Sequence, residues 1–202
     1  AHDCYQQRWL YFARLVAGGS MKLAQRLMPL LNTDILQRIK NIVSATIVRN
    51  GSEIGITSNS TNAMIRFDNK AAKADFTAEF EIYLRAMETS RNTGFVYRTT
   101  GWGPQGYAYL VGLHQSHILF GTQDNGGGAS SAWYDKGSYA HGLAVGQWVK
   151  FKVVAAGTSH KIYINDVLKI DVTDSSYTAA GQFGINVFGS EYQQKYRNIT
   201  IN

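Results

Sequence analysis

The sequence is short of the residues that mark several protein classes. It has one cysteine, Cys4, and two prolines among 202 residues. A single cysteine excludes an intrachain disulfide, which favours assembly in a reducing compartment over a disulfide-stapled secreted scaffold. Long apolar runs are also missing. Residues 9–17, WLYFARLVA, are too short to cross a bilayer, and Arg14 interrupts them.

The start of the chain does not match a secretory leader. Arg14 lies inside the apolar run and Asp3 precedes it, whereas a signal peptide places its positive charge before an uninterrupted apolar segment. Ala1 is a residue that remains after removal of an initiator methionine. We therefore expect a protein made in the cytoplasm without a signal peptide and displayed on a virion or other particle, with an extracellular location as the alternative.

Acidic residues are scarce at one end of the chain. The net charge is +6, yet residues 1–45 hold six Lys/Arg and two Asp, whereas the remaining residues hold fourteen basic and twelve acidic ones. The basic excess therefore belongs to the N-terminal segment. We expect no nucleic-acid partner. Contact of this segment with a membrane surface is a weaker alternative, which Arg8, Arg14, Lys22 and Arg26 could serve.

Two periodicities divide the chain. Residues 5–17, 20–28 and 33–43 show helical spacing of apolar side chains, whereas from about residue 46 the period changes to two. We therefore predict an N-terminal helical docking segment, 1–45, and a β-sandwich, 46–202. The apolar positions of the helices are Trp9, Phe12, Val16, Leu23, Leu27, Ile35, Ile39 and Ile42.

The helical stripe predicts a contact. Eight such side chains are too large a surface to leave in water, since their burial is worth on the order of 10–20 kcal/mol before entropy costs. We expect the stripe to dock on protein subunits of a larger assembly. The alternative is that the helices cap one open end of their own sandwich.

Alternating strands fill the rest of the sequence. In FTAEFEIYL, residues 76–84, apolar side chains alternate with polar ones, and KIYINDVLKIDV places Asn165-Asp166 between two strand-like runs as a tight hairpin. About ten such runs follow one another without a helical pattern between them. The sequence therefore predicts a mainly β protein, an antiparallel jelly-roll sandwich, with a short helical start.

Residues 146–188, GQWVKFKVVAAGTSHKIYINDVLKIDVTDSSYTAAGQFGINVF, carry a family pattern. A Trp strand leads to a Y-x-N hairpin, a D-x-T/S strand and a closing G-x-F/I-G-hydrophobic strand. With DFTAEFEIYL, GFVYR and GYAYLVGL upstream, the chain resembles concanavalin/laminin-G-like sandwiches over residues 50–202. The fructan-binding carbohydrate-binding modules of levanases are the most similar of these. The resemblance implies a lectin-like fold and a glycan or polysaccharide ligand.

The resemblance also implies a sugar site. An acid of the FTxE strand and an arginine of the GxVxR strand would grip hydroxyls, while aromatic rings cover the apolar face of the sugar. Phe188 stands where the family usually places Trp. A structural ion pair between Glu79 and Arg98 is the competing interpretation. The candidate sugar-binding residues are Glu79, Arg98, Tyr107 and Phe188, with Trp102 and Trp133 as exposed aromatics.

Other motifs fail on their context. GWGPQG, residues 101–106, matches G-x-G-x-x-G but joins two strands, and DNGGGASSAWY, residues 124–134, is best interpreted as a flexible loop delivering Trp133 and Tyr134. Neither a Ser-hydrolase elbow nor an H-E-x-x-H motif occurs. The histidines at 114, 117, 141 and 160 are scattered. Asp124, Asp166, Asp171 and Asp174 could bind a structural calcium ion, although we expect no metal and no other cofactor.

Three function classes remain open. The preferred one is a non-catalytic, lectin-like component of a larger assembly such as a bacteriophage virion, docked through residues 1–45. The second is a carbohydrate-binding module of a secreted glycosidase. The third is a concanavalin-like sugar hydrolase. Against the third, the only neighbouring acids on one strand are Glu79 and Glu81, in a stretch that does not resemble the glycosidase acid motif.

Overall fold

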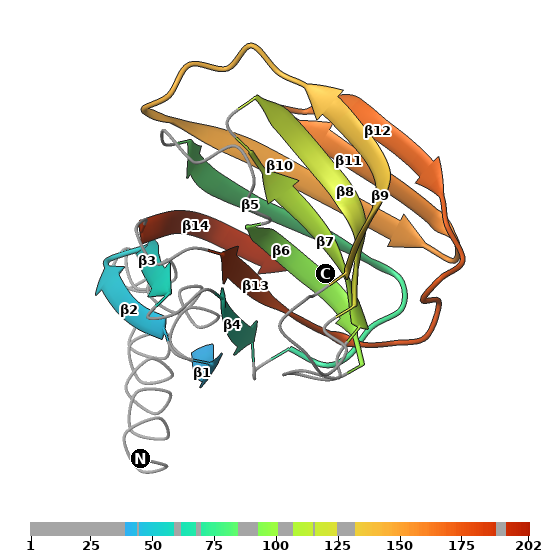
Figure 1. Cartoon of the computed structure of the whole chain (residues 1–202), viewed down its shortest axis with the longest axis horizontal. Coiled ribbons are helices and arrows are strands. Elements are labelled where there is room, and N and C mark those ends of the chain that lie inside the picture. Colours follow the sequence, from blue (N-terminus) through green and yellow to red (C-terminus); the bar gives the residue numbers. More distant parts are fainter. Residues whose placement is uncertain are drawn as a thin grey trace, which may run out of the picture.

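The protein is an antiparallel sandwich of two sheets (Figure 1). The computed structural model describes residues 39–43, 45–58, 62–67, 70–84, 93–100, 107–114, 116–124, 132–188 and 193–202. The first sheet has the order β1 (Ile39–Val43), β4 (Asn62–Phe67), β13 (Gln182–Phe188), β6 (Gly94–Thr99), β7 (Tyr107–Leu113), β8 (His117–Asp124) and β9 (Ala132–Ala140). The second has the order β12 (Val167–Thr173), β11 (Ser159–Ile164), β10 (Gln147–Ala156), β5 (Phe76–Leu84), β14 (Gln193–Ile201), β3 (Glu53–Ser58) and β2 (Ala45–Asn50).

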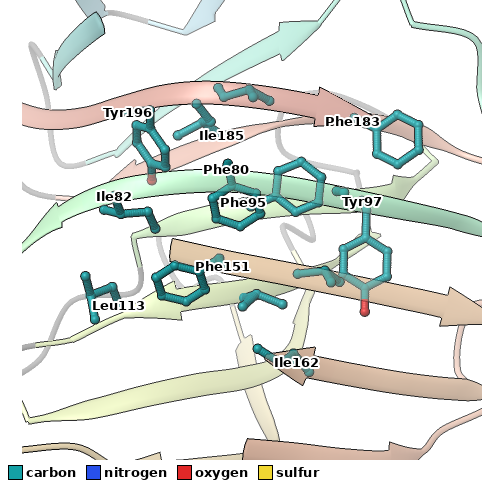
Figure 2. Packing of buried hydrophobic residues seen from close by; sticks show 14 of the residues in the cluster. Phe80, Ile82, Phe95, Tyr97, Leu113, Phe151, Ile162, Phe183, Ile185 and Tyr196 are labelled. Carbon is teal, nitrogen blue, oxygen red and sulfur yellow. The ribbon is translucent and has the colours of Figure 1, made fainter. Parts of the chain in front are cut away.

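Alternation along the strands builds the core between the sheets. In β5, every second residue from Phe76 to Leu84 is buried, and β10 and β11 repeat this pattern. Phe80 of the second sheet stacks on Phe151 at 5.3 Å between ring centroids and meets Phe95 of the first sheet at 4.9 Å (Figure 2). The Phe80–Phe95 pair joins the two sheets, whereas Phe80–Phe151 lies within the second, and each pair adds about 0.5–1.5 kcal/mol beyond the burial of its apolar area.

The predicted sandwich is therefore confirmed, together with its hairpin at Asn165-Asp166. Both residues have positive φ, 49° and 66°, and Ile164 pairs with Val167 across the turn. This left-handed pair of residues is the conformation of a type I′ turn, which Asn and Asp tolerate and which matches the twist of the flanking strands. Among the described residues, no helix is long and apolar enough to cross a membrane.

One predicted helix is wrong at its C-terminal end. Residues 39–43 form strand β1, in which Ile39 pairs with Phe67 and Val43 with Met64 of β4. Three of its five residues are β-branched, and pairing along β4 outweighs their helical spacing. The other predicted docking positions, Trp9, Phe12, Val16, Leu23, Leu27 and Ile35, lie outside the described residues, and the division at residues 45/46 stays a prediction.

The loop expected to deliver Trp133 and Tyr134 is also wrong at these two positions. Both lie in strand β9, which pairs antiparallel with β8. The sequence of this strand, AWYDKGSYA, has too many polar residues and a glycine to reveal a strand by alternation alone. Its pairing with β8 completes the edge of the first sheet.

Candidate functional site: the rim around Arg98

Arg98 lies where the two sheets meet at one end of the sandwich. It is the next-to-last residue of β6 in the first sheet, and its guanidinium reaches the β10–β11 turn of the second. Nε donates to the carbonyl of Ala74 at 2.7 Å, Nη1 to that of Tyr177 at 2.9 Å and Nη2 to that of Gly157 at 2.8 Å. Arg98 is only 1 % exposed. One side chain thus ties together three segments that are distant in sequence.

The backbone at Arg98 is shaped for this role. Its φ of 49° is left-handed, a conformation that costs a non-glycine residue about 1–2 kcal/mol. Gly181 packs so closely on it that a Cβ there would meet the Cα of Arg98 at 2.5 Å. The surrounding contacts offset this strain. They also assign the three guanidinium nitrogens to backbone carbonyls, a different role from the predicted grip on sugar hydroxyls.

Glu79 does not join Arg98. It alternates with the buried Ala78 and Phe80 on β5 and so faces outward from the second sheet, where it lies opposite Lys152 of β10. The predicted ion pair between Glu79 and Arg98 is therefore wrong. The carboxylate beside Arg98 belongs to Asp75, at 3.6 Å from Nη2, and it also accepts a hydrogen bond from the Gly157 amide at 2.8 Å.

Tyrosine rings lie next to the hydrogen bonds that Arg98 makes. Tyr107 begins β7 and is 41 % exposed. Its ring lies 5.5 Å from that of Tyr177, the residue whose carbonyl Arg98 holds, and Tyr177 in turn meets Tyr109 edge-on at 5.5 Å. Two residues of the predicted sugar set, Arg98 and Tyr107, are thus brought together through Tyr177. We call Asp75, Arg98, Tyr107 and the loop 174–177 the rim site.

Asp174 anchors the loop of the rim site. Its Oδ1 accepts from the Tyr109 hydroxyl at 2.6 Å and from the Ser176 amide at 2.9 Å, and its Oδ2 lies 2.7 Å from Nζ of Lys136. Burial alone would raise the pKa of Asp174, but the hydrogen bonds from Lys136, Tyr109 and Ser176 outweigh it and hold that pKa well below its usual range. The carboxylate is therefore charged whenever the protein is at neutral pH.

A buried histidine supports the same loop from the core. His160 is fully buried against the rings of Tyr97, Tyr109 and Phe120. Its Nε2 lies 3.3 Å from the Asp174 carbonyl and must donate there, so Nδ1 accepts from the Tyr97 hydroxyl at 2.7 Å. Burial, assisted by the charge of Arg98, lowers the pKa of His160 to about 4. The imidazole is neutral at neutral pH.

Of the remaining predicted aromatics, only the side chain of Trp133 lies within the described residues. Trp133 is partly buried on the outer face of the first sheet, where it packs against Val96, Ala108 and Leu110. Phe188 ends β13, its backbone opposite Asn62, and its side chain lies outside the described residues, as does Trp102. Trp133 therefore does not join the rim site.

The metal candidates have other partners. Within the described ranges, no three His, Cys, Asp or Glu side chains gather so that they could hold a metal ion. Asp166 pairs with Lys150 and Asp171 with Lys161, as Asp174 does with Lys136, and the side chain of Asp124 is not described. His141 Nε2 donates to the backbone carbonyl of His114 at 2.8 Å, a contact that involves one imidazole only.

Sequence reasoning missed Tyr177, Asp75 and the anchoring role of Asp174. A local signal existed for the last of these: TDSSY, residues 173–177, places Asp two residues before Ser176, and the side chain of Asp174 accepts from the amide of that residue. This is the geometry of an Asx turn, which Asp-Ser sequences favour. The approach of Asp75 and Tyr177 to Arg98 has no local signal.

Comparison with known proteins assigns the chain to a family. The profile described as 3-keto-alpha-glucoside-1,2-lyase-like domain matches residues 31–202. The chain belongs to this family. Its match begins within the segment predicted as a separate helical unit.

Among its relatives are a levanase and a carbohydrate-binding module. The levanase of Bacillus subtilis (strain 168) is 27% identical over 132 residues, which are 65% of this chain and 18% of the levanase. The carbohydrate-binding module CBM66 from Bacillus subtilis has a TM-score of 0.65 at 24% identity, covering 82% of this chain and 95% of that one.

A putative glycosyl hydrolase from Parabacteroides distasonis ATCC 8503 shares the fold more remotely. Its TM-score is 0.55 at 13% identity, covering 86% of this chain and 91% of that one. The predicted resemblance to lectin-like sandwiches and to levanase modules is thus confirmed. The family description adds a sugar-lyase relationship that the sequence patterns did not suggest.

Proposed function

We propose that this domain binds carbohydrate at the rim site. The observation that carries the proposal is the exposed ring of Tyr107, which lies against the partly buried ring of Tyr177 and beside polar groups that can bind hydroxyls. Tyrosine rings cover the apolar face of a sugar, while carboxylate, ammonium and hydroxyl groups order its hydroxyls. The polar groups here are Asp75, whose side chain is 68% exposed, Lys136 and Ser176.

The rim is also rigidly supported. The loop that carries Tyr177 is held by Arg98, by Asp174 and, beneath them, by the buried His160. A binding surface loses less affinity to ordering when its side chains are already fixed in the free protein. The levanase and carbohydrate-binding module among the relatives support a glycan as ligand and make fructans the first candidates to test.

The direct test is the variant Tyr107→Ala. We expect its affinity for levan, or for the glycan that a glycan array identifies, to fall about 5- to 30-fold, the equivalent of about 1–2 kcal/mol for a lost ring contact. Isothermal titration calorimetry measures this. The matched control is Tyr163→Ala, which removes a ring from the outer face of the second sheet, where it contacts Lys152.

Two outcomes contradict the proposal. One is a wild-type protein that binds no glycan on the array. The other is an equal loss of affinity in the Tyr107 and Tyr163 variants, since that result would place the ligand away from the rim.

The family description favours a second candidate, a sugar lyase. A 1,2-elimination from a 3-keto-glucoside removes the proton on C2, forms the C1–C2 double bond and releases the C1 oxygen with a proton. Such a reaction needs a base beside C2. At the rim the accessible carboxylate is Asp75, whereas His160 is buried and closed to substrate. Turnover of 3-keto-glucosides that is lost in Asp75→Asn would establish this function in place of pure binding.

The assembly role of residues 1–45, with display on a particle such as a virion, is proposed from their apolar stripe. Because β1 begins at Ile39, a truncated chain has to keep that strand, and one starting at Leu31 also keeps the family match. We expect this chain to fold and to bind glycan while losing its oligomeric or particle contacts in size-exclusion light scattering. An unchanged mass distribution would remove the assembly role, and loss of folding would assign the segment to the sandwich itself.

A further inference from the structure

Tyr177 is fixed by backbone contacts on both of its sides. Its carbonyl accepts from Arg98, and its amide donates to the hydroxyl of Tyr109 at 3.1 Å. Its ring lies between those of Tyr107 and Tyr109, 5.5 Å from each. The position of the Tyr107–Tyr177 ring pair therefore depends on a residue, Tyr109, that is itself fully buried.

The Tyr109 hydroxyl joins both ends of the loop. It accepts a hydrogen bond from the Tyr177 amide, because an N–H group can only donate. It also donates a hydrogen bond to Oδ1 of Asp174 at 2.6 Å. The same Oδ1 accepts from the Ser176 amide at 2.9 Å. The Tyr109 hydroxyl oxygen thus links Asp174 and Tyr177, the first and last residues of the loop 174–177. Lys136 balances the negative charge of Asp174.

From this arrangement we infer that Tyr109 is a positioning residue for the rim site: its buried hydroxyl holds Tyr177 beside Tyr107 and so sets the affinity for carbohydrate without touching it. This inference rests on the proposed function. It separates two roles of the same side chain, since the ring fills the core and the oxygen orients the loop.

The variant Tyr109→Phe removes this oxygen alone. The ring keeps its stacking on Tyr97 at 5.3 Å and on Phe120 at 5.6 Å. The chain also offers a matched control. Tyr196 is equally buried, and its hydroxyl has no hydrogen-bond partner among the described residues, so Tyr196→Phe removes a core hydroxyl that holds no loop.

Two readouts test the inference. The first is amide hydrogen exchange at Tyr177, followed by NMR. We expect it to be at least about 10-fold faster in Tyr109→Phe and unchanged in Tyr196→Phe, because only the former loses the acceptor of that amide. The second is affinity for levan or the glycan identified on the array, expected to fall about 3- to 10-fold in Tyr109→Phe only. Amides of the β5 and β10 core should exchange equally slowly in both variants.

The outcomes are distinct from those that test the proposed function. Unchanged exchange at Tyr177 in Tyr109→Phe overturns the positioning of the loop, whether or not glycan binds. Faster exchange with unchanged affinity, in a protein that binds glycan, overturns the link to the ligand. A wild type that binds no glycan overturns the proposed function and the affinity role with it, while the exchange result still decides what holds the loop.

A second variant tests the inference if Tyr109→Phe does not fold. Lys136→Met leaves Tyr109 in place and removes the ammonium that balances Asp174. We expect a smaller rise in Tyr177 exchange than in Tyr109→Phe, about 2- to 5-fold, and unchanged exchange would contradict the inference. In this variant the exchange alone reports on the position of the loop, because Lys136 is itself proposed to bind hydroxyls.

Discussion

Two surfaces of the sandwich carry aromatic rings beside charges, and they differ in what those groups already contact. On the outer face of the second sheet, the guanidinium of Arg197 lies 4.2 Å from the ring centroid of Trp148, which also meets Tyr83 edge-on at 5.3 Å. Glu81 accepts from Nε of Arg197 at 2.8 Å and from Asn198 at 2.7 Å. One face of the indole and both carboxylate oxygens are therefore already occupied.

At the rim site, by contrast, the charged groups that already have partners contact the interior, and the exposed surface is an aromatic ring. Arg98 and Asp174 bind backbone and core groups, while Tyr107 keeps 41 % of its surface exposed. The two surfaces have similar residue types. Residue composition alone therefore does not make a binding site. A site also needs ring faces and polar groups that the rest of the protein has not already contacted.

The largest expected effect separates the two arginines. Arg98→Ala should lower the free energy of unfolding by about 3–5 kcal/mol, because three backbone carbonyls lose a buried charged donor. Arg197→Ala should cost about 1 kcal/mol, since its pair with Glu81 is partly solvated. Urea denaturation measures both, and equal losses would erase the distinction between the surfaces.

This expected loss of stability differs from the effect of the sugar-gripping role that the family resemblance implies for Arg98. If its main function were to grip a sugar, Arg98→Ala would weaken glycan binding while the fold survived. The three carbonyl contacts make loss of folding stability the first effect instead.

The next effect is a pH dependence that belongs to the rim alone. His160 titrates near 6.5 in an unfolded chain and at about 4 in the folded protein, so the unfolded state takes up the proton first as the pH falls. The contribution of His160 to the free energy of unfolding should therefore be constant above about pH 7 and fall by up to about 3 kcal/mol between pH 6.5 and 4. Asp174, whose pKa is lowered, adds a further loss below about pH 4.

Urea unfolding at successive pH values measures this profile. His160→Gln should flatten it between pH 6.5 and 4. The control His117→Gln, at a histidine near the surface that contacts Ser116, should keep the slope of the wild type. A profile in which the His160 variant retains the full slope would assign the acid sensitivity to another group.

The smallest expected effect concerns Glu79. Glu79→Gln should leave glycan affinity within about 2-fold of the wild type, because this side chain lies on the outer face of the second sheet and not at the rim. A loss of 10-fold or more in titration calorimetry would return the ligand to that face.

Much of the sandwich could be predicted because its signals are local. The alternation in β5 and the Asn165-Asp166 turn depend on neighbours in the chain, and both were found. β1 was mistaken for helix because Ile39, Ile42 and Val43 have helical spacing, and only the pairing with β4 reveals a strand. β9 was missed because its edge position permits a polar sequence.

The site was harder to predict for the same physical reason. Arg98 and Tyr107 were found through family resemblance, but the residues that complete the rim come from positions 75 and 174–177. Long-range packing brings them to Arg98, and no periodicity or spacing along the chain encodes that approach. The structural contacts of Arg98 could not be predicted for the same reason, since its partners are carbonyls of distant residues.

The most direct test of the account is to map bound glycan by NMR. Titration of the 15N-labelled protein with short levan oligosaccharides, or with fragments of the glycan that an array identifies, should shift the amides of Tyr107, Lys136, Ser176 and Tyr177. Amides around Tyr83 and Trp148 should stay in place. Shifts confined to Tyr83, Trp148 and their neighbours on β5, β10 and β14 would contradict the account, because the ligand would then occupy the surface whose groups are already paired.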